Sequence, residues 1–146
     1  MTAPVTLNVY SLVQHPLRST AHDHLYALRR HGRGTQIYLN LEVRKVPRWI
    51  RDAHFDAVVF HTSFLSHRWA PGWFETALER AEPLKGLGGV RVALPQDEHV
   101  RTAQLRRFIA EFEIDHVFSL AAESEWPKIY AGVDRGRVGF STVLPG

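Results

Sequence analysis

Cysteine is absent from the sequence. Without thiols the chain can form neither disulfides nor thiolate metal sites, and it has no cysteine nucleophile. A chain free of cysteine fits a reducing compartment, so we expect a cytoplasmic protein.

Long hydrophobic runs and a marked excess of charge are also missing. No apolar run approaches the roughly 18 residues of a membrane-spanning helix, and the start, MTAPVTLNVYSLV, lacks the basic region and long apolar run of a signal peptide. Lys+Arg 18 against Asp+Glu 15 gives a net charge of only +3, and the basic residues are scattered along the chain. We therefore expect no transmembrane segment and no nucleic-acid partner.

The residues that are present predict one α/β domain over residues 1–146. Six short runs are rich in β-branched and aromatic residues: 6–13, 35–41, 56–62, 90–95, 116–121 and 137–143. Segments with helical spacing lie between them: 19–32, 46–55, 71–88, 100–113 and 124–134. This alternation predicts a Rossmann-like three-layer sandwich of about six mostly parallel strands with helices on both faces.

Motifs of several enzyme classes are absent from the expected strand ends. The connector after the first strand has neither G-x-G-x-x-G nor G-x-x-x-x-G-K-[ST], which excludes a dinucleotide site and a P-loop there. No G-x-S-x-G nucleophile elbow is present. The third strand ends at His61, where a phosphate-accepting receiver domain has an aspartate.

Polar side chains gather instead after the first, third and fourth expected strands. In open parallel sheets, ligands bind beyond the carboxyl ends of the strands, near the point where the strand order reverses. The residues at this predicted edge are Gln14, His15, Arg18, His61, Ser63, Arg68, Trp69, Gln96, Asp97, Glu98 and His99. We expect them to line one ligand site.

Several of these segments together resemble the N-terminal domain of a bacterial GT-B glycosyltransferase of the family-1-like type. The segments are FDAVVFHTSFLSHRW, a strand feeding Gln-Asp-Glu, IDHVFSLAAESEWPKIY and a strand leading to TVLPG. An aromatic residue more often follows Gln-Asp-Glu in that family, so His99 is a departure.

The resemblance implies that the chain is the acceptor-binding half of a two-domain enzyme. A sugar acceptor would bind here, a missing C-terminal domain would hold the nucleotide-sugar, and the domain alone would be inactive. No cofactor is expected. The alternative is a non-catalytic Rossmann-like module that binds a small ligand or a protein.

Asp97, His15 and His61 are the candidate catalytic residues. A carboxylate at position 97 can deprotonate an acceptor hydroxyl; alternatively, Asp97 and Glu98 cap the following helix. A histidine can serve as base or hydrogen-bond donor, or it can satisfy backbone groups at a strand end.

The candidate substrate contacts also have structural alternatives. Arg18 and Arg68 could bind an anion or be ordinary solvated arginines, and Trp69 could stack on a sugar or pack against the sheet. The other candidate contacts are Gln14, Ser63, Gln96, Glu98 and His99. No metal is expected, because His22 and His24 are two apart on a helix and point to different sides.

Overall fold

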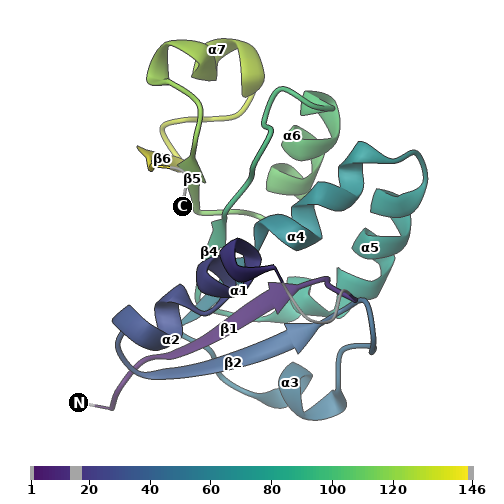
Figure 1. Cartoon of the computed structure of the whole chain (residues 1–146), viewed down its shortest axis with the longest axis vertical. Helices are drawn as coiled ribbons and strands as arrows, with labels where there is room; N and C mark the ends of the chain where they lie inside the picture. The colour runs from purple at the N-terminus through teal and green to yellow at the C-terminus, as the bar shows by residue number, and fades with distance from the viewer. Residues whose placement is uncertain (1, 14–17, 145–146) are drawn as a thin grey trace.

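A six-stranded, all-parallel sheet organises the chain (Figure 1). The computed structural model describes residues 2–13 and 18–144. The strands are β1 (Val5–Tyr10), β2 (Thr35–Asn40), β3 (Ala57–Phe60), β4 (Val90–Ala93), β5 (His116–Ser119) and β6 (Gly139–Thr142). Their order in the sheet is β2-β1-β3-β4-β5-β6. The predicted α/β Rossmann-like class and the parallel strands are confirmed.

Short helices connect the strands. The α-helices are α1 (Ser19–Leu25), α2 (Ala27–His31), α3 (Arg48–Asp52), α4 (Thr62–Leu65), α5 (Trp73–Ala81), α6 (Thr102–Glu111) and α7 (Trp126–Ile129). The 3-10 turns are η1 (Ser66–Trp69), η2 (Glu82–Gly86) and η3 (Glu123–Glu125). Helices α1 and α2 lie on the opposite side of the sheet from α4, α5 and α6 (Figure 1), as right-handed crossovers in opposite directions require.

The two faces of the sheet differ in burial. Leu7, Val58 and Ala93 lie on the face covered by α4–α6 and are almost completely inaccessible. On the other face, Val90 is 52% exposed, and an apolar hollow of about 350 Å³ extends from α1 and α2 across the middle strands. The core is therefore concentrated on the α4–α6 side.

A cluster of phenylalanines fixes α4 and α6 to that side. The Phe60 and Phe108 rings meet edge-on at 5.0 Å between centroids, and Phe108 stacks on Phe112 at 5.0 Å. Phe64 of α4 lies 6.0 Å from Phe108. Edge-to-face and offset aromatic pairs add roughly 0.5–1.5 kcal/mol to the burial of the rings. The connectors after β3 and β4 are therefore held in place by a closely packed aromatic core.

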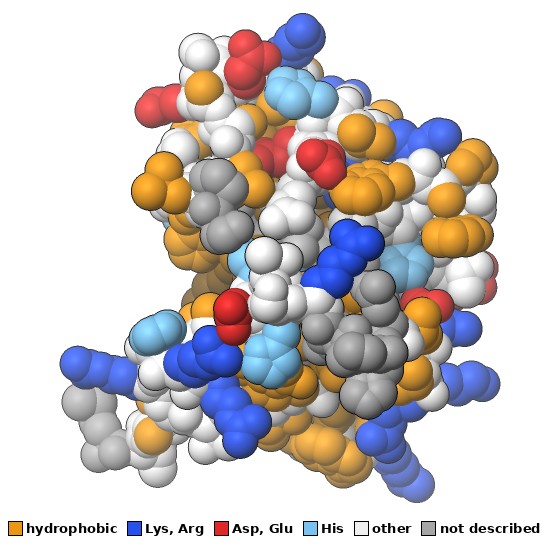
Figure 2. Space-filling view, viewed as in Figure 1, with side chains coloured by type: hydrophobic (Ala, Val, Ile, Leu, Met, Phe, Trp, Pro, Cys, Tyr) orange, Lys and Arg blue, Asp and Glu red, His pale blue; other side chains and the backbone are white. Residues whose placement is uncertain are grey.

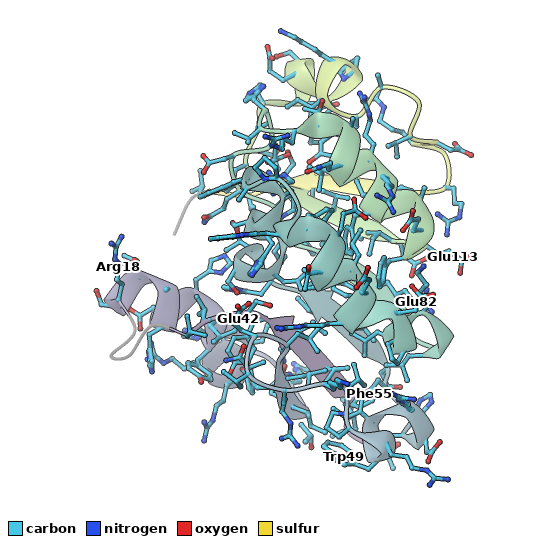
Figure 3. All side chains as sticks on the ribbon, turned by 90° about the vertical axis from the view of Figure 1, so that its right-hand side faces the viewer. Arg18, Glu42, Trp49, Phe55, Glu82 and Glu113 are labelled. Carbon is cyan, nitrogen blue, oxygen red and sulfur yellow. The ribbon has the colours of Figure 1, made fainter. Side chains whose placement is uncertain are left out.

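The carboxyl ends of the parallel strands lie on one side of the sheet and their amino ends on the other, and the two sides carry different residues. Figure 3 shows Arg18 and Glu42 on one side of the molecule, and Phe55, Glu82 and Glu113 on the other. Gly89 directly precedes β4, on the side where the strands begin. Its φ is +88°, and a Cβ there would lie 2.4 Å from the Phe55 carbonyl oxygen. Tight turns of this kind need glycine.

Candidate functional site

A polar hollow lies where the strand order reverses, between β1 and β3. It measures about 470 Å³ and is lined by the connectors after β1, β3 and β4 and by α1. We call it the switch-point cleft and define it by Ser11, Arg18, His24, His61, Ser63 and Gln96. This is the position where open α/β sheets bind ligands.

His61 is buried at the start of α4, where its ring caps the helix. Its Nδ1 accepts the Ser63 backbone N–H at 3.1 Å and contacts the Ser63 hydroxyl at 2.8 Å. The Ser63 hydroxyl in turn accepts the Ser11 backbone N–H at 3.2 Å. These bonds tie the connector after β1 to the connector after β3.

His24 extends this chain of hydrogen bonds from α1. Its Nδ1 lies 2.8 Å from His61 Nε2. Burial lowers the pKa of His24, and burial together with the neighbouring His24 lowers the pKa of His61 to about 3. Both rings are therefore neutral at physiological pH, and a base as weak as His61 is poorly matched to proton abstraction near pH 7.

Glu98 is buried away from the cleft and is saturated by donors from its own chain. One carboxylate oxygen accepts the backbone N–H groups of Leu120 and Ala121 at 2.6 and 3.1 Å. The other accepts the Ser119 hydroxyl at 2.6 Å and the Tyr130 hydroxyl. Burial and the Glu98 carboxylate raise the pKa of Tyr130. Four bonds fill the carboxylate, so Glu98 joins two loops and has no capacity for substrate.

Arg68 is likewise completely buried, and it holds the loop after β4 through backbone carbonyls. Its guanidinium donates to Val100 at 3.0 Å, Leu65 at 2.9 Å and Asp97 at 2.9 Å, and also to Gln96. The guanidinium faces the protein interior, so the structure gives Arg68 a positioning role in place of the expected anion contact.

Asp97 points outward from the loop that Arg68 holds. It is exposed and has φ 45°, an uncommon conformation that Arg101 (φ 50°) and Glu113 (φ 48°) share. Within residues 2–13 and 18–144, no hydrogen bond or ion pair engages its carboxylate. It directly follows Gln96, which lines the cleft.

The alternative that Asp97 and Glu98 cap a helix is wrong. Helix α6 begins at Thr102, its N-cap is Arg101 in a left-handed conformation, and no side chain caps it. Among the described residues, neither the Asp97 nor the Glu98 carboxylate accepts a hydrogen bond from the first amides of α6.

The remaining expected site residues fall into three groups: those that line the cleft, those that are exposed and do not line it, and those that lie outside the described residues. Arg18, Ser63 and Gln96 line the cleft with His61. Trp69 is 45% exposed, His99 is also exposed, and neither lines the cleft. Gln14 and His15 lie outside the described residues, so their predicted roles stay predictions.

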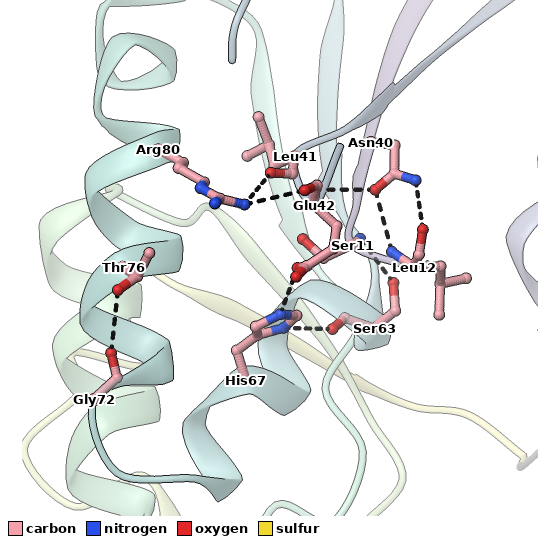
Figure 4. Close-up of polar contacts among 10 residues, drawn as sticks. All are labelled: Ser11, Leu12, Asn40, Leu41, Glu42, Ser63, His67, Gly72, Thr76 and Arg80. Atoms are coloured by element: carbon pink, nitrogen blue, oxygen red, sulfur yellow. Dashed lines mark hydrogen bonds and ion pairs between the residues drawn. The ribbon is translucent and has the colours of Figure 1, made fainter. Parts of the chain in front are cut away.

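A second, smaller hollow of about 190 Å³ shares Ser11 with the cleft, and Figure 4 shows Glu42, His67 and Arg80 of its lining. His67 spans it, with Nε2 2.9 Å from a Glu42 carboxylate oxygen and Nδ1 3.0 Å from the Ser63 carbonyl. Arg80 donates to the Leu41 carbonyl at 2.9 Å. The side chains of Glu42, His67 and Arg80 in this hollow are already bonded to one another or to backbone carbonyls. The hollow therefore offers a ligand fewer hydrogen-bonding groups than the cleft does.

Sequence reasoning considered His24 and His67 only as metal ligands and did not count either among the expected site residues, and it missed Glu42. His24 carried a signal, because Ala21, His24 and Leu28 follow the three- and four-residue spacing of one helix face. The contact between His67 and Glu42 joins residues 25 apart in sequence, and no local pattern indicates it.

Among the described residues, no group of three or more His, Cys, Asp or Glu side chains could hold a metal ion. Over the same residues, no helix has both the length and the apolar character needed to cross a bilayer. Basic, acidic and histidine side chains are interspersed on the face in Figure 2, without a continuous basic surface.

The fold and cleft together define a Rossmann-like α/β domain with a polar site at its switch point. No protein-family model, curated protein or solved structure matches the chain.

Proposed function

We propose that this chain is the acceptor-binding half of a GT-B glycosyltransferase, which moves a sugar from a nucleotide-sugar to an acceptor hydroxyl. The observation that carries the proposal is the position of Asp97. It is an exposed carboxylate that directly follows Gln96 of the switch-point cleft, on a loop held by the buried Arg68 and Glu98. The sequence resemblance supplies the reaction class.

Asp97 is the proposed general base. Its carboxylate would take the proton of the acceptor hydroxyl as that oxygen bonds to the anomeric carbon. The bond from that carbon to the nucleoside diphosphate breaks at the same time, and the diphosphate leaves with the electron pair. Positioned acid–base catalysis of this kind contributes about 10²- to 10⁴-fold in rate.

His61 takes a supporting role in this scheme. With a pKa near 3 it stays neutral, and its bonds to Ser63 and His24 fix the side of the cleft that faces the acceptor. The nucleotide-sugar would be held by a further domain, so the chain of 146 residues would bind acceptor without turnover.

The experiment measures nucleoside diphosphate release by the longest natural polypeptide that contains these residues. The donors are UDP-, GDP- and TDP-sugars, and the acceptors are a panel of sugars and hydroxylated lipids. Asp97→Asn is expected to lower kcat at least about 100-fold with an unchanged melting temperature. Asp52→Asn is the matched control, because Asp52 is an exposed aspartate at the end of α3.

Either of two results would overturn the proposal. One is release by Asp97→Asn at the rate of the control. The other is acceptor binding by the natural polypeptide with no transfer from any donor, which would instead identify a non-catalytic binding module.

A further inference from the structure

Arg18 carries the one permanent charge among the described residues that line the switch-point cleft. The lining contains Arg18, two histidines, several hydroxyls and the Gln96 amide, and none of the described lining residues is acidic. A cleft with a cation and no carboxylate favours a ligand that brings a negative charge of its own.

Hydrogen bonds fix the tautomer of His61. The Ser63 backbone N–H can only donate, so His61 Nδ1, which accepts it at 3.1 Å, carries no proton. The single proton of the neutral ring therefore resides on Nε2. That nitrogen lies 2.8 Å from His24 Nδ1, so His61 donates and His24 accepts.

The same reasoning fixes the tautomer of His24. Since Nδ1 accepts the proton of His61, the proton of His24 must be on Nε2. Within the part of the chain that the structure describes, no hydrogen bond engages this N–H, and it is not among the buried polar atoms that lack a partner. The chain that begins at a Ser63 backbone N–H thus ends in a His24 donor without a partner among the described residues. His24 lines both the cleft and the apolar hollow beside α1 and α2.

The fixed tautomers also exclude His24 as a base. Its only unprotonated nitrogen is engaged by His61, and the nitrogen left for a ligand carries a proton. His24 can therefore recognise an acceptor oxygen but cannot take a proton from a hydroxyl. This role complements Asp97, which can only accept.

We infer that the switch-point cleft binds an anionic oxygen group, a carboxylate or a phosphate, through the His24 Nε2–H and the Arg18 guanidinium. The inference deepens the proposed function, because the anionic group would belong to the sugar acceptor. Hydrogen bonds to a charged partner contribute roughly 1.5–3 kcal/mol each, which corresponds to about tenfold or more in affinity for each donor.

The experiment compares three sugars that differ only at C6: glucose, glucuronate and glucose 6-phosphate. Calorimetric titration of the 146-residue chain is expected to show binding of at least one of the two anions and at least tenfold weaker binding of glucose. The better of the two anions identifies carboxylate or phosphate as the preferred group.

Matched variants assign the contacts. His24→Leu and Arg18→Gln should each weaken anion binding about tenfold or more. His24→Gln should recover most of the affinity, since its amide N–H reaches the position of Nε2. Arg48→Gln is the control, because it removes an exposed positive charge from α3, which contributes nothing to the cleft, and it should change the Kd less than twofold.

Long-range ¹H–¹⁵N spectra of the histidine rings provide a readout that needs no variant. Both His24 and His61 should show a protonated Nε2 and an unprotonated Nδ1. A protonated His24 Nδ1, binding of glucose as tight as that of the anions, or no binding of either anion at millimolar concentration would each overturn the inference.

The inference and the proposed function fail in distinguishable ways. Anion binding without any nucleoside diphosphate release by the natural polypeptide would contradict the transferase and leave the cleft chemistry intact. Sugar transfer to neutral acceptors only would support the transferase and contradict the anion site.

Discussion

Two polar clusters lie at the same edge of the sheet, and they are completed in opposite ways. Around Glu98 and Arg68, donors and acceptors from distant loops saturate one another inside the chain. Around His61, the hydrogen bonds run in one direction and end at His24, on the wall of an open cleft. A closed network positions a loop, whereas an open one is available to a ligand.

The closed network should show the largest effect on stability. Glu98→Ala leaves the Leu120 N–H and the Tyr130 hydroxyl without their acceptor, and it removes one of two acceptors from the Ala121 N–H and the Ser119 hydroxyl. Buried donors that lose a partner cost about 1–3 kcal/mol each. We expect a loss of at least about 3 kcal/mol in the free energy of unfolding, measured by urea denaturation. The neighbouring exposed residue provides the control: Asp97→Asn should stay within about 0.5 kcal/mol of the parent. Equal losses would show that both carboxylates are structural.

The histidines of the open network should make the fold sensitive to acid. The pKa of His61 is about 3 in the folded chain and about 6.5 when unfolded. Between pH 3 and pH 6.5 the unfolded state binds more protons than the folded state. The free energy of unfolding is therefore greatest above pH 6.5 and falls as the pH drops toward 3. The loss between pH 7 and pH 4 should be about 3 kcal/mol, with a further contribution from His24.

Urea denaturation across this pH range checks the effect. His61→Gln should flatten the profile between pH 6.5 and 4. His99→Gln should leave the profile unchanged, since His99 is exposed. The assignment to His61 is wrong if its variant keeps the parental slope.

Removing one link within the open network should have the smallest effect. Ser63→Ala deletes the hydroxyl that bonds His61 and accepts the Ser11 N–H, while the Ser63 backbone bond remains. We expect a loss of about 1 kcal/mol by thermal or chemical denaturation. Ser124→Ala, at an exposed position in η3, should change stability by less than about 0.5 kcal/mol. If Ser63→Ala lost as little stability as Ser124→Ala, the Ser63 hydroxyl would make no contribution to the network.

The fold was accessible from the sequence because its signals are local. Continuous apolar runs such as those around Val58 and Val92 predict strands covered on both sides, and all six expected strands are present. Helix α4 and turn η1 were missed because four residues are too few for a hydrophobic period to show.

The site was only partly accessible, because burial of a polar residue depends on distant partners. Nothing in Gln96–His99 indicates that Glu98 meets Ser119 and Tyr130, which are 21 and 32 residues away. The convergence of His61, Ser63 and Gln96 was predictable, since parallel strands bring their carboxyl ends to one edge. Whether a side chain at that edge faces inward or outward was not.

The most direct test of the central claim, that the switch-point cleft is the ligand site, is an amide chemical-shift map of the ¹⁵N-labelled chain. The titrant is whichever of glucuronate and glucose 6-phosphate binds more tightly. The largest shifts are expected at Ser11, His24, Ser63 and Gln96, which surround the cleft. Shifts centred on Glu42 and Trp73, at the smaller hollow, or on no defined region would contradict the account.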